Sequence, residues 1–323
     1  MESDSRIFVA GHRGLVGSAI CRGLQRNAYS NLLLRTRSQL DLADREAVRS
    51  FFSQEQPEYV FLAAAKVGGI LANDTYPADF IRENLEIQTN VIDSSYRNRV
   101  KRLLFLGSSC IYPKMAPQPM REEYLLTGLL EPTNRAYAVA KIAGIEMCWS
   151  YNRQYGTRYL AAMPTNLYGP GDNFDPDGSH VLPALIRKVA KAKLAGEKKL
   201  PVWGTGTPRR EFLYSDDLAE ACIHLLNLPD PVYDSLLTRD TVPLINIGTG
   251  EDLTIRELAE LISEVLRFDG ELVFDPARAD GTPRKLLDVS RINALGWKAR
   301  TSLKEGIRQT YKSARQQLET KSH

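Results

Sequence analysis

Short apolar runs and longer amphipathic stretches alternate along the first half of the chain. The apolar runs predict strands at Ile7–Ala10, Leu32–Leu34, Tyr59–Ala63, Leu103–Gly107 and Tyr159–Met163. Helical patterns lie between them, near Val16–Arg26, Arg45–Ser53, Ala78–Arg99 and Arg135–Tyr155. Because such alternation is typical of βαβ units, we expect an α/β fold with a doubly wound parallel sheet covered on both faces.

The pattern changes after Pro164. Gly, Pro, Asp and Asn crowd the segment Gly169–Gly178, which predicts an irregular loop. A helix is expected at about Val181–Ala195, short strands at Val202–Trp203 and Phe212–Tyr214, and a helix opened by a capping box at Thr254 that runs to about Phe268; the chain is again helical and polar from Ser302. We therefore predict a larger domain over residues 1–168, joined by part of 216–250, and a smaller α/β domain over residues 169–323.

Composition narrows the class of protein. The 323 residues carry a net charge of only +3, which does not suggest nucleic acid but suits a ligand with several phosphates. Apolar runs stay well short of the roughly 18 residues that a membrane span needs. Four scattered cysteines have no metal-like spacing, and the N-terminus enters a strand without room for a signal peptide, so we expect a cytoplasmic protein without disulfides or metal.

A glycine-rich turn follows the first predicted strand. Ile7–Ala10 runs into Gly11-His12-Arg13-Gly14-Leu15-Val16-Gly17, a G-x-x-G-x-x-G sequence, and then into a helix. Glycine lets the backbone turn tightly and approach a pyrophosphate, which then sits at the helix N-terminus. At the first strand–helix junction of a βαβ series this motif predicts a dinucleotide-binding Rossmann domain.

Two arginines bear on the choice of dinucleotide. Arg37 lies 20 residues after Gly17, where proteins that bind NAD usually carry an acidic residue near the ribose 2′-hydroxyl. A guanidinium at that position can bind a 2′-phosphate, and Arg13 in the glycine loop could approach it from the other side. NADP is therefore favoured over NAD, the alternative being that both arginines are solvated surface residues.

A tyrosine and a lysine share one face of a predicted helix. Tyr137 and Lys141 are four residues apart, and Ser108 follows the fourth predicted strand. A nearby ammonium favours the phenolate, so we expect the pKa of Tyr137 to fall from its usual value of about 10. Such a tyrosine can give a proton to a carbonyl oxygen while a hydride reaches the carbon.

These residues carry a family resemblance. The glycine loop, Ser108, Tyr137 and Lys141 resemble the extended short-chain dehydrogenase/reductases. More narrowly, the chain resembles the GDP-L-fucose synthase family of 3,5-epimerase-4-reductases, in stretches spread over most of its length: Val9–Gly17, Ala63–Gly69, Leu104–Lys114, Met163–Gly169, Val202–Gly204 and Asp280–Lys285. Tyr214 departs from the family, whose members often carry histidine there, and leaves the local packing open.

The resemblance implies a reaction and further binding residues. It implies NADPH as reductant, GDP-4-dehydro-6-deoxy-D-mannose as substrate, GDP-L-fucose as product, and a homodimer built from the helices near Ala78–Arg99 and Arg135–Tyr155. The cofactor residues would be Gly11, Arg13, Gly14, Leu15, Val16, Gly17, Arg37, Ala63, Ala64, Lys141, Pro164, Asn166, Leu167 and His180. The sugar nucleotide would be held by Lys188, Trp203, Arg210 and Asp280.

Epimerisation needs acid–base groups beyond those that serve reduction. C3 and C5 of the sugar flank the C4 ketone, so loss of a proton from either gives an enolate whose oxygen Ser108 and Tyr137 could stabilise. Cys110 and His180, with ordinary pKa values of about 8.5 and 6.5, are suited to removing and returning that proton. Spacing alone favours an inert buried cysteine and a solvated loop histidine; the resemblance assigns them proton transfer.

Two other functions compete with this reading. A sugar-nucleotide 4-epimerase or 4,6-dehydratase retains NAD, which Arg37 and the lack of a Thr-Asp-Glu-type triad after the fourth strand argue against. A non-catalytic NADP-sensing protein would have the fold without turnover, and the presence of Ser108, Tyr137 and Lys141 argues against it.

Overall fold

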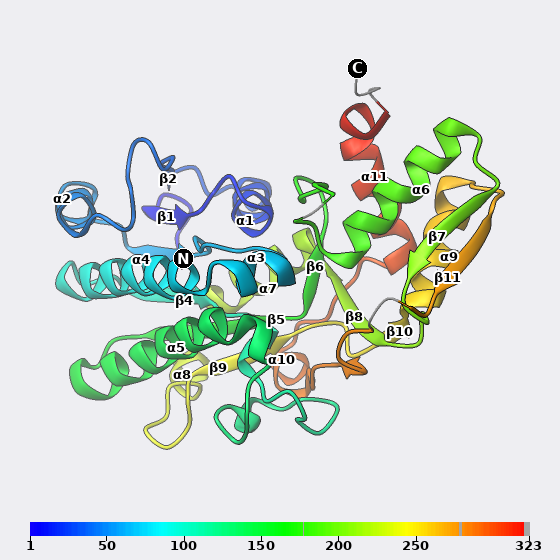
Figure 1. The fold of residues 1–323 in the computed structure, drawn as a ribbon. Coiled ribbons are helices and arrows are strands. Elements are labelled where there is room, and N and C mark those ends of the chain that lie inside the picture. The colour runs from blue at the N-terminus through cyan, green and yellow to red at the C-terminus, as the bar shows by residue number, and fades with distance from the viewer. Residues whose placement is uncertain (177, 278–279, 320–323) are drawn as a thin grey trace.

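A parallel sheet organises the first half of the protein (Figure 1). The computed structural model describes residues 1–176, 178–277 and 280–319. Within them, six parallel strands lie in the order β2 (Leu32–Leu33), β1 (Ile7–Ala10), β3 (Tyr59–Leu62), β4 (Arg102–Leu106), β5 (Tyr159–Pro164) and β9 (Leu244–Ile247). This confirms the predicted α/β class. The strand order reverses between β1 and β3, the kind of switch point at which such sheets bind ligands.

Helices cover both faces of this sheet. Ile7 and Val9 of β1 pack in one apolar cluster with α1 (Leu15–Arg26) and α7 (Ser215–Asn227). Phe8 and Ala10 pack in a second cluster with α2 (Arg45–Glu55), α4 (Pro77–Arg97) and α5 (Arg135–Tyr155). Alternate residues of one strand thus enter opposite layers, which explains why the strands read as continuous apolar runs.

The second half packs around a separate apolar cluster. Three helices, α6 (Val181–Ala195), α9 (Ile255–Leu266) and α11 (Leu303–Glu319), contact one another and the paired strands β7 (Lys199–Trp203) and β11 (Glu271–Asp275), on the right in Figure 1. Strand β8 (Arg209–Tyr214) pairs with β6 (Asn166–Tyr168), β10 (Asp252–Thr254) and β12 (Arg284–Lys285). Since β6 follows β5 directly in the chain, the second half begins where β5 leaves the main sheet.

Most of the predicted elements are present. Helices α5 and α6 have the predicted bounds, and the capping box at Thr254 is formed. The prediction that α4 reaches Arg99 is wrong: the helix ends at Arg97, and Arg99 adopts a left-handed φ of 54°. Sequence reasoning missed several elements: α3 (Ile70–Thr75), α7, α8 (Asp230–Asp234), α10 (Ser290–Ala294) and the 3-10 turns Ser109–Ile111, Glu122–Tyr124 and Pro132–Asn134.

The structure shows how Tyr214 packs. Tyr214 is buried, its hydroxyl donates to Gln309 at 3.2 Å, and its ring contacts Tyr168, so the departure from the family is accommodated by packing.

In the part of the chain that the structure describes, no helix combines the length and apolarity that crossing a membrane requires. All four cysteines are buried free thiols.

The buried carboxylate of Glu211 forms hydrogen bonds that link the two halves of the protein. Glu211 of β8 accepts hydrogen bonds from the backbone N–H groups of Thr249 (2.7 Å) and Gly250 (2.8 Å), just after β9, and from Leu287 (2.9 Å), just after β12. Its own carbonyl accepts from the amide of Asn166 at 2.8 Å. Because buried polar groups in such networks are costly to leave unpaired, Glu211 fixes how β8 and β12 meet the main sheet.

Candidate active site

A large cavity opens at the carboxyl ends of the parallel strands. It has a volume of about 770 Å³ and is lined by the segments that follow β1, β3, β4 and β5 and by Gly171, Asp172, Asn173, Gly178 and His180. Segments from successive parallel strands meet at this edge because the strands run in the same direction. The volume is that of a pocket for a large organic ligand.

The glycine loop fits a pyrophosphate at the start of α1. Gly14 caps that helix without a side-chain hydrogen bond and lines the cavity, and a Cβ there would meet no atom closer than 3.5 Å. Gly11 and Gly17 serve a different purpose: a Cβ on Gly11 would lie 2.7 Å from the Ala64 nitrogen, and one on Gly17 2.1 Å from the Gly11 oxygen. Close packing of the protein's own backbone therefore requires these two glycines, which leaves the helix N-terminus open to an anion.

Among the predicted arginines, Arg37 lines the cavity and Arg13 does not. The Arg37 side chain is 76% exposed, with its guanidinium 3.7 Å from Asp41 and 3.8 Å from Glu83. Arg35, which the sequence did not single out, also lines the cavity, but it pairs with Glu55 and stacks on Phe51. Arg37 is therefore the guanidinium best able to turn toward a 2′-phosphate.

Ser108, Tyr137 and Lys141 meet inside the cavity as predicted from their spacing. The Lys141 Nζ donates to the Leu106 carbonyl at 2.8 Å and lies 5.8 Å from the centre of the Tyr137 ring. The Ser108 side chain interacts with that of Tyr137. Helix α5 thus carries the tyrosine and the lysine, and the end of β4 supplies the serine.

The prediction of a lowered tyrosine pKa is wrong. Burial raises the pKa of Tyr137, and the interaction with Ser108, which lowers it, offsets only part of that effect. Burial also lowers the pKa of Lys141 to about 8. Burial disfavours the charged form of each group, so Tyr137 is a neutral phenol that can donate a proton. A pKa of about 8 still leaves Lys141 mostly protonated at neutral pH.

Cys110 and His180 approach this group from different cavities. Cys110 lies in the turn Ser109–Ile111, where its thiol interacts with Ser108. It lines a second pocket of about 10 Å³, roughly the space of one water molecule. Burial raises the pKa of its thiol. His180, the residue before α6, lines the large cavity and is exposed to it, and desolvation by the surrounding protein lowers the pKa of its imidazole.

The four predicted substrate residues form two pairs in the second half. The Lys188 Nζ lies 4.5 Å from the centre of the Trp203 ring, and the Trp203 side chain is 63% exposed. Arg210 interacts electrostatically with Asp280, whose carboxylate accepts from the Thr205 backbone N–H at 3.0 Å. Neither pair lines the two cavities described above.

The remaining predicted cofactor residues all line the large cavity: Leu15, Val16, Ala63, Ala64, Pro164, Asn166 and Leu167. Sequence reasoning missed Asp172, which also lines it. Asp172 accepts a hydrogen bond from the Asn173 backbone N–H at 2.7 Å, while its Oδ2 is buried without a hydrogen-bond partner among the described residues. Burial raises the pKa of this carboxyl to about 7.

Asp172→Asn should therefore stabilise the protein more at high pH than at low pH. The raised pKa means that the folded protein favours the protonated carboxyl; this contribution is complete below the ordinary pKa of 3.8 and is lost as pH rises through about 7. Asparagine resembles the protonated acid at every pH, so the variant should gain on the order of 1–3 kcal/mol at pH 9 relative to pH 5. Thermal unfolding at both pH values measures this, and an equal difference in Tm at both would contradict it.

Comparison with known proteins shows the family. Residues 7–235 match the NAD dependent epimerase/dehydratase family. The chain is 58% identical over 310 residues to GDP-L-fucose synthase 1 of Arabidopsis thaliana, covering 96% of this chain and 93% of that protein. It is 55% identical to the GDP-L-fucose synthase of Escherichia coli, covering 96% of each. The structure matches that of a GDP-mannoheptose C4 reductase from Campylobacter jejuni with NADP bound, at 43% identity and a TM-score of 0.88 over 98% of this chain and 99% of that one.

Proposed function

The chain belongs to the NAD dependent epimerase/dehydratase family and, within it, to the GDP-L-fucose synthases, and from that premise we propose the chemistry of its site. It is an NADP-dependent oxidoreductase and epimerase that converts GDP-4-dehydro-6-deoxy-D-mannose to GDP-L-fucose. The observation that carries the site assignment is the position of Ser108, whose side chain acts on the pKa of both Tyr137 and Cys110. One hydroxyl thus connects the residues suited to reduction with the thiol suited to epimerisation.

Epimerisation would proceed at the carbons beside the ketone. Cys110, as thiolate, takes the proton from C3 or C5: the C–H bond breaks, an S–H bond forms, and the electron pair moves to the C4 oxygen. Ser108 and Tyr137 hydrogen-bond to that oxygen and stabilise the enolate. His180 returns a proton to the opposite face of the carbon, and its lowered pKa makes the imidazolium a stronger acid toward that carbon.

Reduction would follow on the same ketone. The glycine loop, Arg37 and the segment Pro164–Leu167 would hold NADPH, which would supply the hydride for this reduction. Tyr137 donates a proton to the C4 oxygen, a role supported by its raised pKa, which keeps the phenol protonated. Lys141 is held by Leu106 beside the tyrosine ring and favours charge on the phenolic oxygen as the proton leaves.

A GDP-linked heptose is the alternative substrate, because the Campylobacter reductase shares 43% of its sequence with this chain. The protein should be mixed with NADPH and either sugar nucleotide in deuterated water, with NADPH absorbance followed. Net oxidation together with deuterium at C3 and C5 supports the epimerase-reductase; oxidation without deuterium indicates a simple C4 reductase. Product without net oxidation indicates an NAD-retaining epimerase or dehydratase, and no turnover indicates an NADP sensor.

Changing Arg37 to glutamate should remove or invert the preference for NADPH over NADH. A charge-assisted hydrogen bond contributes about 1.5–3 kcal/mol, so the loss in NADPH affinity should be roughly tenfold to a hundredfold. Binding titrations with both cofactors measure this. Arg13→Glu is the matched control: Arg13 does not line the cavity, so the same charge change there should alter the preference less. Equal binding of both cofactors by the unaltered protein would contradict the assignment.

Three broader proposals accompany this function. The domain division stays as predicted, with residues 1–168 and part of 216–250 binding the cofactor and residues 169–323 binding the sugar nucleotide. The chain forms a homodimer through α4 and α5, which pack side by side and leave Val139 and Tyr155 of α5 exposed. It works in the cytoplasm, a proposal supported by four cysteines that are all free thiols.

A further inference from the structure

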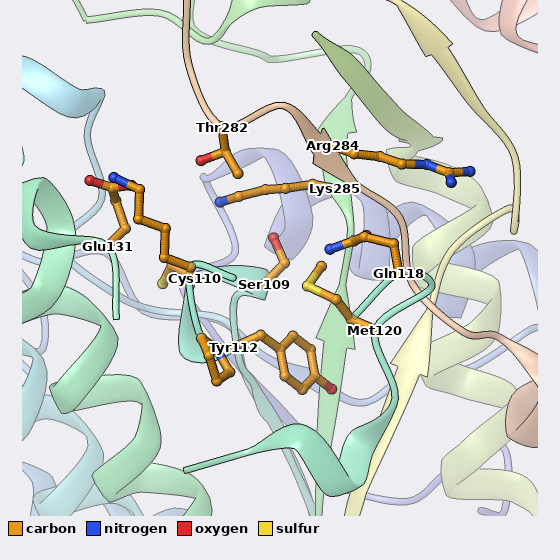
Figure 2. Close-up of a pocket in the computed structure, with 11 residues that line it drawn as sticks. Ser109, Cys110, Tyr112, Gln118, Met120, Glu131, Thr282, Arg284 and Lys285 are labelled. Carbon is orange, nitrogen blue, oxygen red and sulfur yellow. The ribbon is translucent and has the colours of Figure 1, made fainter. Parts of the chain in front are cut away.

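The small pocket beside Cys110 contains a lysine that the proposed mechanism does not use. Lys285 lies on β12 and extends into this pocket on the side of Ser109 and Cys110 (Figure 2). Arg284, the preceding residue, extends in the opposite direction in the same view, and its guanidinium pairs with Asp252. The pocket therefore receives the charge of Lys285 and not that of its neighbour.

The Lys285 ammonium is not neutralised by a carboxylate. It forms no hydrogen bond or ion pair with a side chain in the ranges 1–176, 178–277 and 280–319. Glu131, the carboxylate that lines the pocket, is paired with Lys114 at 3.0 Å. Burial lowers the pKa of Lys285. The charged and titratable groups that act on it are Cys110, which raises its pKa, Arg210 across the β12–β8 pairing, which lowers it, and Glu131, which raises it.

Hydrogen bonds fix the backbone at Lys285 and at the two residues that follow it. Lys285 is paired with Arg210 in the β12–β8 register. The next two N–H groups are fixed by side chains: Leu286 donates to Gln118 at 2.8 Å and Leu287 to the buried carboxylate of Glu211 at 2.9 Å. A strand anchored in this way fixes the backbone from which the Lys285 side chain extends into the pocket.

Cys110 needs a nearby positive charge to act as a base. Burial disfavours its thiolate, and the groups around it are Ser108 and Tyr137, which are neutral, and the two lysines 141 and 285. The Lys141 Nζ already donates a hydrogen bond to the Leu106 carbonyl and lies beside the Tyr137 ring. Lysine beside a thiol favours the thiolate, which is the form that accepts a proton from carbon.

We propose that Lys285 is a positioning residue for epimerisation, whose ammonium stabilises the thiolate of Cys110 across the small pocket. This inference rests on the proposed function, in which Cys110 is the base. It assigns Lys285 to the proton-transfer step alone and gives it no part in hydride transfer.

The test compares Lys285→Met, which removes the charge at similar length, with Lys285→Arg, which keeps it, and with Arg284→Met as the matched control. The first measurement is thiolate absorbance in the ultraviolet as a function of pH, taken for each variant as the difference from the same protein carrying Cys110→Ser. An opposite charge at about 4–6 Å shifts a pKa by about 1–3 units, so the Cys110 titration in Lys285→Met should move upward by about one unit or more. Lys285→Arg should restore much of the shift, and Arg284→Met should leave the titration unchanged.

The second measurement is deuterium entry at C3 and C5 of the GDP-sugar against pH, in deuterated water without NADPH. Lys285→Met should slow deuterium exchange at least tenfold at neutral pH. The rise of the exchange rate with pH should also move to higher pH, by the same amount as the Cys110 titration. An unchanged titration, or a raised KM with an unchanged pH profile, would overturn the proposal and make Lys285 a contact for the substrate phosphates. If the unaltered protein exchanges no deuterium, the proposed epimerase function fails, whereas the thiol titration still decides whether Lys285 stabilises the thiolate.

Discussion

Tyr137→Phe should leave NADPH binding intact and slow reduction of the C4 ketone about 10²–10⁴-fold. The ring still packs against Phe80, but the hydroxyl beside Ser108 is gone, so no group at that position gives a proton to the ketone oxygen. Single-turnover oxidation of bound NADPH measures the step directly, separate from cofactor affinity.

Tyr151→Phe is the matched control for that experiment. Tyr151 lies on the same helix, but its hydroxyl donates to Asp93 at 3.2 Å and it does not line the cavity. The control should reduce the ketone at the normal rate. Near-normal reduction by Tyr137→Phe would show that a different group supplies the proton.

Cys110→Ser should abolish inversion at C3 and C5 while reduction of the ketone continues. Serine keeps nearly the same size, but its hydroxyl is a far weaker base than a thiol, so proton removal should slow by about 10² or more. Deuterium entry without NADPH measures removal alone, and the configuration of the reduced product measures inversion.

His180→Gln gives the complementary result in the same assays. Protons should still be removed by Cys110 but returned poorly, so inversion should be slow while NADPH still binds. Deuterium entering C3 and C5 at the normal rate in Cys110→Ser would place the base on another residue.

The parts of the site that the sequence predicted are those specified by short-range patterns. The spacing of Tyr137 and Lys141 on one helix, and the glycine loop after the first strand, depend on local geometry that a single segment contains. The same holds for α6, whose bounds follow from its amphipathic pattern and the glycine at its end.

The parts that sequence reasoning missed depend on burial and on contacts between distant segments. The raised pKa of Tyr137 and of Asp172 arises from the depth at which the folded chain places them. Lys285 meets Cys110 only because β12 pairs with β8, a register that no local pattern in either strand specifies. Glu211 likewise stands out only in the folded protein, where two separate segments donate to its carboxylate.

The route of the chain through α7 and β9 limits how its sugar specificity can be transplanted between relatives. Both elements come after the first residues of the sugar-binding half, yet α7 packs on α1 and β9 completes the edge of the main sheet. A chimera joined once, after β5, would exchange these two elements along with the sugar-contacting segments and would break side-chain packing that evolved within one parent. A chimera that keeps this packing needs additional crossover points on either side of the α7–β9 stretch. The segments that determine sugar specificity therefore have to be exchanged as two separate pieces of sequence.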